Sequence, residues 1–196
     1  MARERSFDTD TAIDQALQQF WQKGYEGTSI SDLTDALGIN RPSLYSAFGS
    51  KEGLFRKALE RYVNRQGVHL LAALEQPTAR AAVEQLLQFH ADAAGSSGRP
   101  HGCLLVQGAL SCSEENQPIR EELAQQRRAG ELALTERLKR AKAEGDLPAD
   151  ESPADLSRYV WAVCQGLDVQ ANAGLTRAEA RRIVVRAMRA WPEARG

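Results

Sequence analysis

The sequence predicts an all-α protein of about nine helices. Its 196 residues include 30 Ala and 22 Leu, but only 21 Val, Ile and Thr taken together. Ala and Leu favour helices whereas β-branched residues favour strands, so these counts argue against a sheet-rich fold. A hydrophobic content of 42% with 26% charged residues is typical of a packed chain rather than a disordered one. The length fits one domain, or two small domains that share an interface.

Each helix is predicted from an apolar repeat at helical spacing, set between Gly, Pro, Ser or Thr residues. The clearest repeat is the first, which comprises Ile13, Ala16, Leu17, Phe20 and Trp21. We expect Thr9 or Asp10 to cap that helix. Later helices have expected N-caps whose side chains accept bonds from free backbone N–H groups, namely Asn40, Ser50, Thr78, Ser152 and Thr176. The helices are expected at about residues 10–23, 28–37, 41–48, 51–76, 79–94, 102–112, 118–144, 153–173 and 177–191.

Composition and charge limit the possible functional classes. The formal net charge is −1, so nucleic-acid binding must depend on where Lys and Arg are placed rather than on a surplus of them. The longest apolar run, residues 160–164, is far shorter than the about 20 residues of a membrane span. No secretory signal is recognised, and three cysteines without a CxxC pair favour the reducing cytoplasm. We therefore expect a cytoplasmic protein with no membrane partner and no cofactor.

Residues 28–48 have the layout of a helix-turn-helix DNA-binding unit, in which Gly38 marks a tight turn between two short helices. Six apolar residues are placed to fix the helices at a steep angle, namely Ile30, Leu33, Leu37, Ile39, Leu44 and Phe48. The other side of the second helix offers groups suited to base edges and phosphates: Arg41, Pro42, Ser43, Tyr45 and Ser46. Helix starts favour phosphate at Thr28, Ser29, Ser50 and Lys51. An ordinary helical corner is the alternative interpretation of this pattern.

Two runs in the first third of the chain resemble a known family. The first reads Ala16-Leu17-x-x-Phe20-x-x-x-Gly24-Tyr25-x-Gly27-Thr28-Ser29-Ile30-x-x-Leu33. The second reads Leu37-Gly38-Ile39-x-Arg41-x-Ser43-Leu44-Tyr45-x-x-Phe48-x-Ser50-Lys51-Glu52-x-Leu54. Together they resemble the N-terminal module of tetracycline-repressor-type (TetR family) regulators over about residues 9–60, with the spacing of that family and no gap.

The resemblance implies an all-helical homodimer that binds double-stranded DNA at a palindromic operator. Its base-reading helix corresponds to residues 41–48, and its usual phosphate contacts fall on Thr28, Tyr45 and Lys51. We expect a DNA-binding domain over 1–55 and an effector-binding and dimerisation domain over 56–196. One feature departs from a basic DNA-binding module, because residues 1–65 contain nine basic and nine acidic residues. The affinity for DNA should then depend on a few phosphate contacts.

A cavity for an unidentified small-molecule effector is expected among the fifth to eighth helices. The expected lining residues are Leu86, Phe89, His90, Cys103, Leu104, Leu105, Leu110, Leu134 and Trp161. Cys103 lies near a helix start, with Arg99 and His101 close in sequence, so a lowered pKa and a reactive thiolate are possible. Packing as a small apolar residue is the alternative. Metal sensing is a third reading, but no recognised ligand spacing links the histidines and cysteines, and we predict no metal site.

The last two helices each carry a wide apolar stripe. One contains Leu156, Tyr159, Val160, Val163 and Leu167, widened by Trp161, Cys164 and Gly166. The other contains Ile183, Val184, Ala187, Met188 and Trp191. Stripes wider than one core requires indicate a second burial partner, and we predict a four-helix interface between two subunits. The alternative is that these helices only complete the core of the monomer.

The sequence therefore favours a DNA-binding transcriptional regulator, most simply a repressor that a small-molecule or reactive effector releases from its operator. Two alternatives remain, namely a redox-, electrophile- or metal-sensing repressor that acts through Cys103, and a constitutive or activating DNA binder without a ligand. An enzyme is disfavoured and no catalytic residue is predicted, because the chain has no nucleophile elbow, Gly-rich phosphate loop or HExxH motif.

Overall fold

The computed structural model describes residues 7–95, 100–110 and 112–192. Within these ranges it contains nine α-helices, a short 3-10 turn over Glu114–Asn116 and no strand, which confirms the predicted all-α fold. The helices are α1 (Thr9–Lys23), α2 (Ile30–Leu37), α3 (Arg41–Phe48), α4 (Lys51–Leu74), α5 (Ala79–Ala93), α6 (Leu104–Leu110), α7 (Gln117–Ala143), α8 (Pro153–Asn172) and α9 (Arg177–Met188). In the same ranges no helix combines the length and the apolar character that crossing a membrane requires.

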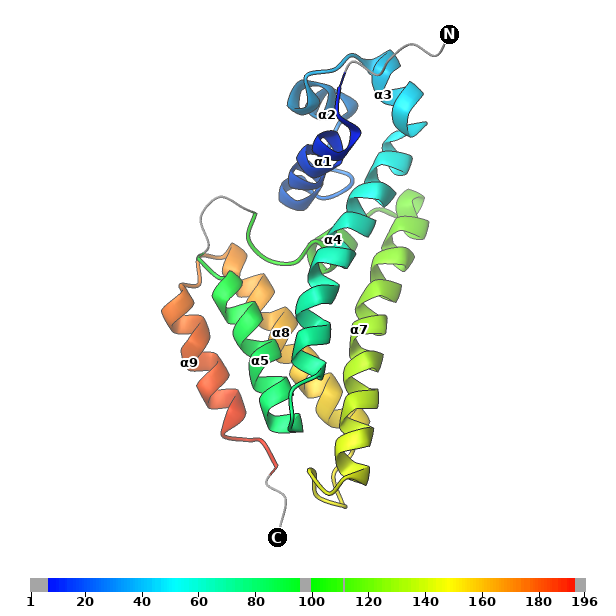
Figure 1. The fold of residues 1–196 in the computed structure, drawn as a ribbon. Coiled ribbons are helices and arrows are strands. Elements are labelled where there is room, and N and C mark those ends of the chain that lie inside the picture. The colour runs from blue at the N-terminus through cyan, green and yellow to red at the C-terminus, as the bar shows by residue number, and fades with distance from the viewer. Residues whose placement is uncertain (1–6, 96–99, 111, 193–196) are drawn as a thin grey trace.

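The long helix α4 connects the two ends of the molecule (Figure 1). At one end, α1, α2 and α3 gather around the N-terminal part of α4. The rest of α4 continues into a larger helical bundle, where it runs beside α7 and packs against α5. In that bundle α5 also packs against α8 and α9, while the short α6 lies against both α7 and α1. The helix-turn-helix unit is thus presented at the far end from most of the bundle.

The expected N-caps begin five of the helices. In α3, α4, α5, α8 and α9 the cap accepts a bond from the backbone N–H three residues later, and the caps are Asn40, Ser50, Thr78, Ser152 and Thr176. The start of α1 differs from the prediction, since Asp8 is its cap rather than Thr9 or Asp10. The Asp8 carboxylate accepts bonds from the N–H groups of residues 10 and 11. Local hydrogen bonding therefore sets most of the helix starts.

Two helices begin later than predicted. Helix α2 begins at Ile30, because Ser29 adopts an extended conformation and caps the helix. Helix α6 spans Leu104–Leu110 rather than residues 102–112. Gly102 has a φ of 75°, a left-handed conformation that cannot belong to an α-helix. A Cβ at Gly102 would also lie 2.8 Å from the Asp168 carbonyl oxygen, so a larger residue does not fit there.

Two groups of buried side chains form the core. One joins α5, α7, α8 and α9 with the C-terminal end of α4. The other fills the space between α1, α2, α3 and the start of α4, where the rings of Phe20, Tyr25 and Phe55 pack with centroids 5.0 to 6.3 Å apart. Leu104 of α6 and Leu123 of α7 belong to this second group and are fully buried in it. Helices α6 and α7 therefore complete the N-terminal core.

Candidate DNA-binding face and effector cavity

Local structure fixes the start of α2 and the turn between α2 and α3. Ser29 and Asp32 form a capping box, in which the Asp32 N–H donates to Ser29 Oγ at 3.0 Å and the Ser29 N–H donates to the Asp32 carboxylate at 2.8 Å. Gly38 ends α2 with φ 62° and ψ 30°, a conformation that favours glycine. Asn40 Oδ1 then accepts a bond from the Ser43 N–H at 2.9 Å, which starts α3.

One face of α3 is buried and the other is open to solvent. Leu44 and Phe48 pack into the N-terminal core. The side chains predicted to contact DNA lie on the opposite face, where Arg41, Pro42, Tyr45 and Ser46 are exposed and Ser43 is half-buried. Tyr45 is 46% exposed, which is high for a large aromatic residue at the surface of a packed domain. Helix α3 thus presents hydrogen-bonding groups at the end of the molecule (Figure 1).

The two residues expected at the start of α2 have different environments. Thr28 is fully buried, and its hydroxyl donates to the Gly24 carbonyl at 2.7 Å. This bond joins the end of α1 to α2, so the Thr28 hydroxyl is not presented to a phosphate. Ser29 is exposed, although its hydroxyl also contacts the Asp32 carboxylate at 2.6 Å. Of these two residues, Ser29 is the one that DNA can reach.

Both predicted basic contacts are held by neighbouring side chains. Arg41 Nη2 donates to Ser31 Oγ of α2 at 3.0 Å. The Lys51 ammonium lies 4.3 Å from the centroid of the Tyr25 ring, a favourable cation–π geometry. Burial lowers the pKa of Lys51, while the charges of nearby Glu26 and Asp32 act in the opposite direction. These contacts position the long side chains at the start of α3 and of α4 before DNA is present.

The acidic residues of α1 pair with arginines of α4. Asp14 lies 2.9 Å from Arg61 and 2.8 Å from Arg65, and Asp10 lies 2.5 Å from Arg61. Asp8 caps α1, and its pKa is lowered by a bond from the Thr11 hydroxyl and by bonds from backbone N–H groups. The carboxylates of Asp10 and Asp14 are therefore occupied along the contact between α1 and α4, whereas that of Asp8 is occupied at the start of α1.

A cavity of about 230 Å³ lies between α4, α5, α7 and α8, with the start of α6 at one side. Six of the expected residues line it, namely Leu86, Phe89, His90, Cys103, Leu105 and Trp161. Two others do not: Leu104 packs in the N-terminal core and Leu134 in the bundle core, both fully buried. The side chain of Leu110 lies outside the described residues. The cavity is therefore placed where helix order predicted it, but with a different set of walls.

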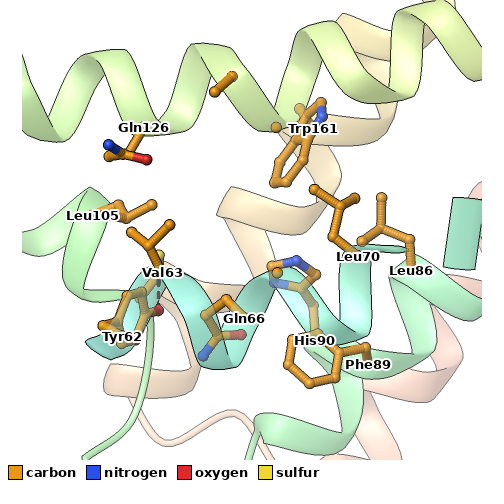
Figure 2. Close-up of a pocket in the computed structure, with 14 residues that line it drawn as sticks. Tyr62, Val63, Gln66, Leu70, Leu86, Phe89, His90, Leu105, Gln126 and Trp161 are labelled. Atoms are coloured by element: carbon orange, nitrogen blue, oxygen red, sulfur yellow. Dashed lines mark hydrogen bonds between the residues drawn. The ribbon is translucent and has the colours of Figure 1, made fainter. Parts of the chain in front are cut away.

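The wall from α4 was not predicted from the sequence, and it comprises Tyr62, Val63, Gln66, Gly67 and Leu70. The wall from α7 was predicted with a different residue, Leu134, and it comprises Gln126, Ala129 and Gly130. Figure 2 shows Gln126 on one side of the cavity and Val63 and Gln66 on the other. The glycines inside α4 and α7 were the signal in the sequence that could have indicated these walls. Glycine is unfavourable inside a helix unless open space or a close approach requires it.

His90 forms a buried pair at the cavity wall. Its Nδ1 lies 3.0 Å from Asp168 Oδ1, and the two side chains are only 11% and 7% exposed. Burial by itself lowers the pKa of His90, but the adjacent Cys164 and Asp168 side chains outweigh it and raise that pKa well above its usual value. A protonated His90 is therefore matched by the Asp168 carboxylate.

Comparisons with known proteins identify the family. The profile described as "Bacterial regulatory proteins, tetR family" matches residues 12–58, and the profile described as "Tetracyclin repressor-like, C-terminal domain" matches residues 77–190. The chain belongs to the TetR family. It is therefore a DNA-binding transcriptional regulator with a helix-turn-helix module.

Relatives of this TetR-family chain match most of its length. It is 32% identical over 193 residues to the HTH-type transcriptional repressor ComR of Escherichia coli (strain K12), which covers 97% of this chain and 92% of ComR. It is 40% identical over 111 residues to the HTH-type transcriptional repressor BdcR of the same strain. The matched region covers 56% of this chain and 56% of BdcR. A cysteine mutant of the TetR family transcriptional regulator CifR, solved in complex with a 26-bp double-strand operator DNA, has a TM-score of 0.93 at 41% identity and covers 97% of this chain and 100% of CifR.

Cys103 lies on the cavity wall of this TetR-family chain, directly before α6. Its thiol accepts a hydrogen bond from the Tyr62 hydroxyl at 3.3 Å. Burial raises the pKa of Cys103 and the charge of Asp168 raises it further, so the lowered pKa considered from the sequence is wrong. Arg99 lies outside the described residues, and His101 is exposed. Across the described residues, no group of three His, Cys, Asp or Glu side chains is placed to hold a metal ion.

Hydrogen bonds join the segment around α6 to the TetR-family DNA-binding module. Trp21 Nε1 of α1 donates to the Gly102 carbonyl at 3.0 Å, one residue before the cavity-lining cysteine. Glu26, between α1 and α2, accepts bonds from the Ser113 N–H and from Asn116 Nδ2. The segment around α6 thus contacts the cavity and the DNA-binding module together.

Proposed function

We propose that this chain is a transcriptional repressor that binds a palindromic operator as a homodimer and leaves it when a small molecule occupies the cavity. The outward face of α3, with exposed Arg41, Tyr45 and Ser46 behind which Leu44 is buried, is the observation that carries the proposal. ComR is named a repressor, and CifR was solved with operator DNA. Both support the same role for this chain.

Within the proposed complex, α3 lies in the major groove. Arg41 and Ser46 suit base edges, whereas Tyr45 and Lys51 suit phosphates. Lys51 stands at the start of α4, where free N–H groups and the helix dipole add to the attraction for phosphate. We assign DNA binding to residues 1–55 and effector binding and dimerisation to residues 56–196, although α4 runs through this boundary.

The test of DNA binding uses a duplex that the protein itself selects from random-sequence DNA. We expect Lys51→Ala and Tyr45→Ala to weaken binding in a gel-shift assay without unfolding the protein. In a dimer, Lys51→Ala removes two phosphate contacts, so the slope of log affinity against log salt should fall by about 2. Lys139→Ala, at an exposed lysine of α7, is the matched control. Unchanged affinity in both module variants would remove the assignment.

The proposed dimer forms through α8 and α9. Helix α8 has a buried face that includes Val160 and Leu167, and a second apolar face that is exposed, comprising Tyr159, Ala162, Gly166 and Val169. These four positions repeat at intervals of three and four residues, which is the spacing of helix–helix interfaces. On α9, Ile183 is also exposed. A dimer is needed because one recognition helix reads few base pairs, whereas two can read half-sites about 34 Å apart.

Light scattering at micromolar concentration tests the dimer. We expect a dimeric mass for the protein, a monomeric mass for Val169→Glu, and loss of operator binding in that variant. Leu132→Glu changes an apolar residue on α7 that is 61% exposed, against 46% for Val169, and should remain dimeric. A monomeric mass for the unmodified protein would contradict the proposed dimer. Dissociation by Leu132→Glu alone would contradict its placement on α8 and α9.

Release by an effector requires that the ligand bind one dimer shape better than the other. An occupied cavity favours the shape whose recognition helices no longer match the half-site spacing, and the difference in ligand affinity sets the size of the effect. The segment around α6 lines the cavity with Cys103 and Leu105, and the bonds of Trp21 to Gly102 and of Glu26 to Ser113 join this segment to the module. A constitutive DNA binder would keep its operator whichever compound fills the cavity.

A covalent effector at Cys103 is the second candidate, since this thiol lines the cavity. A raised pKa leaves little thiolate at neutral pH, so only electrophiles that the cavity concentrates would react well. Mass spectrometry after treatment with N-ethylmaleimide shows whether the thiol reacts, and an operator-release assay compares Cys103→Ser with the unmodified protein. A variant that is released like the unmodified protein would refute sensing through Cys103.

A further inference from the structure

The lining of the cavity contains few charges. None of the 14 described residues that line it is Asp, Glu, Lys or Arg. A charged ligand that enters such a cavity loses its hydration and finds no side chain of opposite charge in exchange. An uncharged ligand avoids this cost. The side chains of Gln66 and Gln126 can both donate and accept hydrogen bonds, which suits a hydroxyl or carbonyl group.

His90 does not change this conclusion. Its ring is bonded to Asp168, so the positive charge of a protonated His90 is already balanced inside the protein. A carboxylate placed beside His90 would also approach the buried carboxylate of Asp168. The pair therefore presents no uncompensated positive charge to an anionic ligand.

The size of the cavity fits one aromatic ring with a small substituent. Its volume is about 230 Å³, whereas an apolar cavity of about 150 Å³ in another protein holds benzene. The walls are rich in aromatic and aliphatic side chains, and Figure 2 shows Phe89, Trp161, Leu70 and Leu86 at one end of the cavity. Flat apolar molecules pack well against such walls.

Gly67 keeps part of this space open on α4. Glycine is an unfavourable residue in the middle of a helix, and Gly67 lies well inside α4. A Cβ at this position would meet no described atom within 4 Å, so packing does not require glycine. Gly130 on α7 is different, because a Cβ there would lie 2.8 Å from the Trp161 ring. The gap at Gly67 lies in the cavity wall and is available to a ligand that approaches the α4 backbone.

We propose that the cavity binds an uncharged molecule of the size of a substituted benzene ring, and that this molecule lies against α4 at Gly67. The inference rests on the proposed repressor function in one respect, because it takes this ligand to be the effector. Binding to the cavity itself requires no DNA.

Three compounds that share a benzyl or benzoyl skeleton test the choice of charge. Benzyl alcohol is uncharged, benzoate carries a negative charge and benzylamine a positive charge at pH 7.5. Isothermal calorimetry with the full-length protein measures the three affinities without DNA. We expect benzyl alcohol to bind at least about ten-fold more tightly than either ion. The proposal is overturned if an ion binds as tightly as the alcohol, or if the alcohol shows no binding at millimolar concentration.

Two variants at one position test the place of binding. Gly67→Leu fills the gap, whereas Gly67→Ala adds one methyl group and is the matched control. We expect Gly67→Leu to weaken binding of benzyl alcohol at least about ten-fold and Gly67→Ala to change it less than about three-fold. Circular dichroism checks that both variants fold, and Ala129→Leu fills the cavity from α7 as a second route. Unweakened binding in both filled variants would overturn the placement.

A DNA-release assay separates this inference from the proposed function. With the selected duplex bound, we expect benzyl alcohol to release the operator and Gly67→Leu to resist release. Release by benzoate and benzylamine to the same extent would overturn the inference. A protein that binds no duplex at all refutes the repressor function instead, and the calorimetric result is unaffected by it.

Discussion

Replacing Leu123 of α7 by Ala tests whether the N-terminal core depends on the C-terminal bundle. Leu123 is fully buried among side chains of the DNA-binding module, although it lies far along the chain. Its Cδ1 would be 2.9 Å from a Cβ at Gly108, so α6 packs directly against it. Buried Leu→Ala changes cost about 2.7–5 kcal/mol, with the higher values where the surroundings cannot collapse. We expect a loss of about 3 kcal/mol or more in the free energy of unfolding.

The same helix supplies the control. Leu132 is 61% exposed, so Leu132→Ala should change the free energy of unfolding by less than about 0.5 kcal/mol. Gly108 provides a rescue experiment. The Leu123 side chain leaves no room for a Cβ at Gly108, and Leu123→Ala removes that side chain. We expect Gly108→Ala to destabilise the unmodified protein but to recover about 1 kcal/mol in the Leu123→Ala background.

Urea unfolding at one fixed protein concentration measures these changes, since the proposed dimerisation would make stability depend on concentration. Far-UV circular dichroism reports all helices, and tryptophan fluorescence reports Trp21 in the module together with Trp161 and Trp191 in the bundle. We expect the two signals to change together and the midpoint to fall in Leu123→Ala. A loss no larger than that of Leu132→Ala would refute the shared core.

Three other substitutions test single contacts. Trp21→Phe removes the bond to the Gly102 carbonyl and should lower the free energy of unfolding by about 1 kcal/mol, measured by the same urea titration. Asn40→Ala removes the cap of α3 and should cost about 1 kcal/mol and weaken binding to the selected duplex in a gel shift. The raised pKa of His90 stabilises the fold fully below about pH 6.5, its unfolded value, and this contribution is lost as pH rises through the folded value. Asp168→Asn should therefore flatten the fall of the melting temperature above pH 6.5; an unchanged pH profile would contradict the pairing.

Features set by neighbouring residues could be predicted from the sequence. The caps at Asn40, Ser50 and Thr176 depend on a side chain and an N–H group three residues later, so the local sequence is sufficient. The outward face of α3 follows from the helical period once Leu44 is taken as buried. The family resemblance rests on the same local features.

Features set by distant residues could not be predicted in this way. The apolar character of Leu104 and Leu134 did not indicate whether they face a cavity or a core, because this depends on the rotation of helices about their axes. The pKa of Cys103 is another case. Its neighbours in sequence suggested a low value, but burial and the charge of Asp168, which lies far away in the chain, raise the pKa, and the hydrogen bond from Tyr62 offsets this only in part.

The balance of charge in the DNA-binding module has a structural explanation. Nine acidic residues match nine basic ones over residues 1–65, yet α3 itself contains Arg41 and no acidic residue. Asp10 and Asp14 are paired with arginines on the side of α1 that faces α4. These two carboxylates therefore contribute to the packing of α1 against α4. For a chain with a net charge of −1, we therefore expect the affinity for DNA to depend on a few phosphate contacts, with a salt dependence set by those contacts.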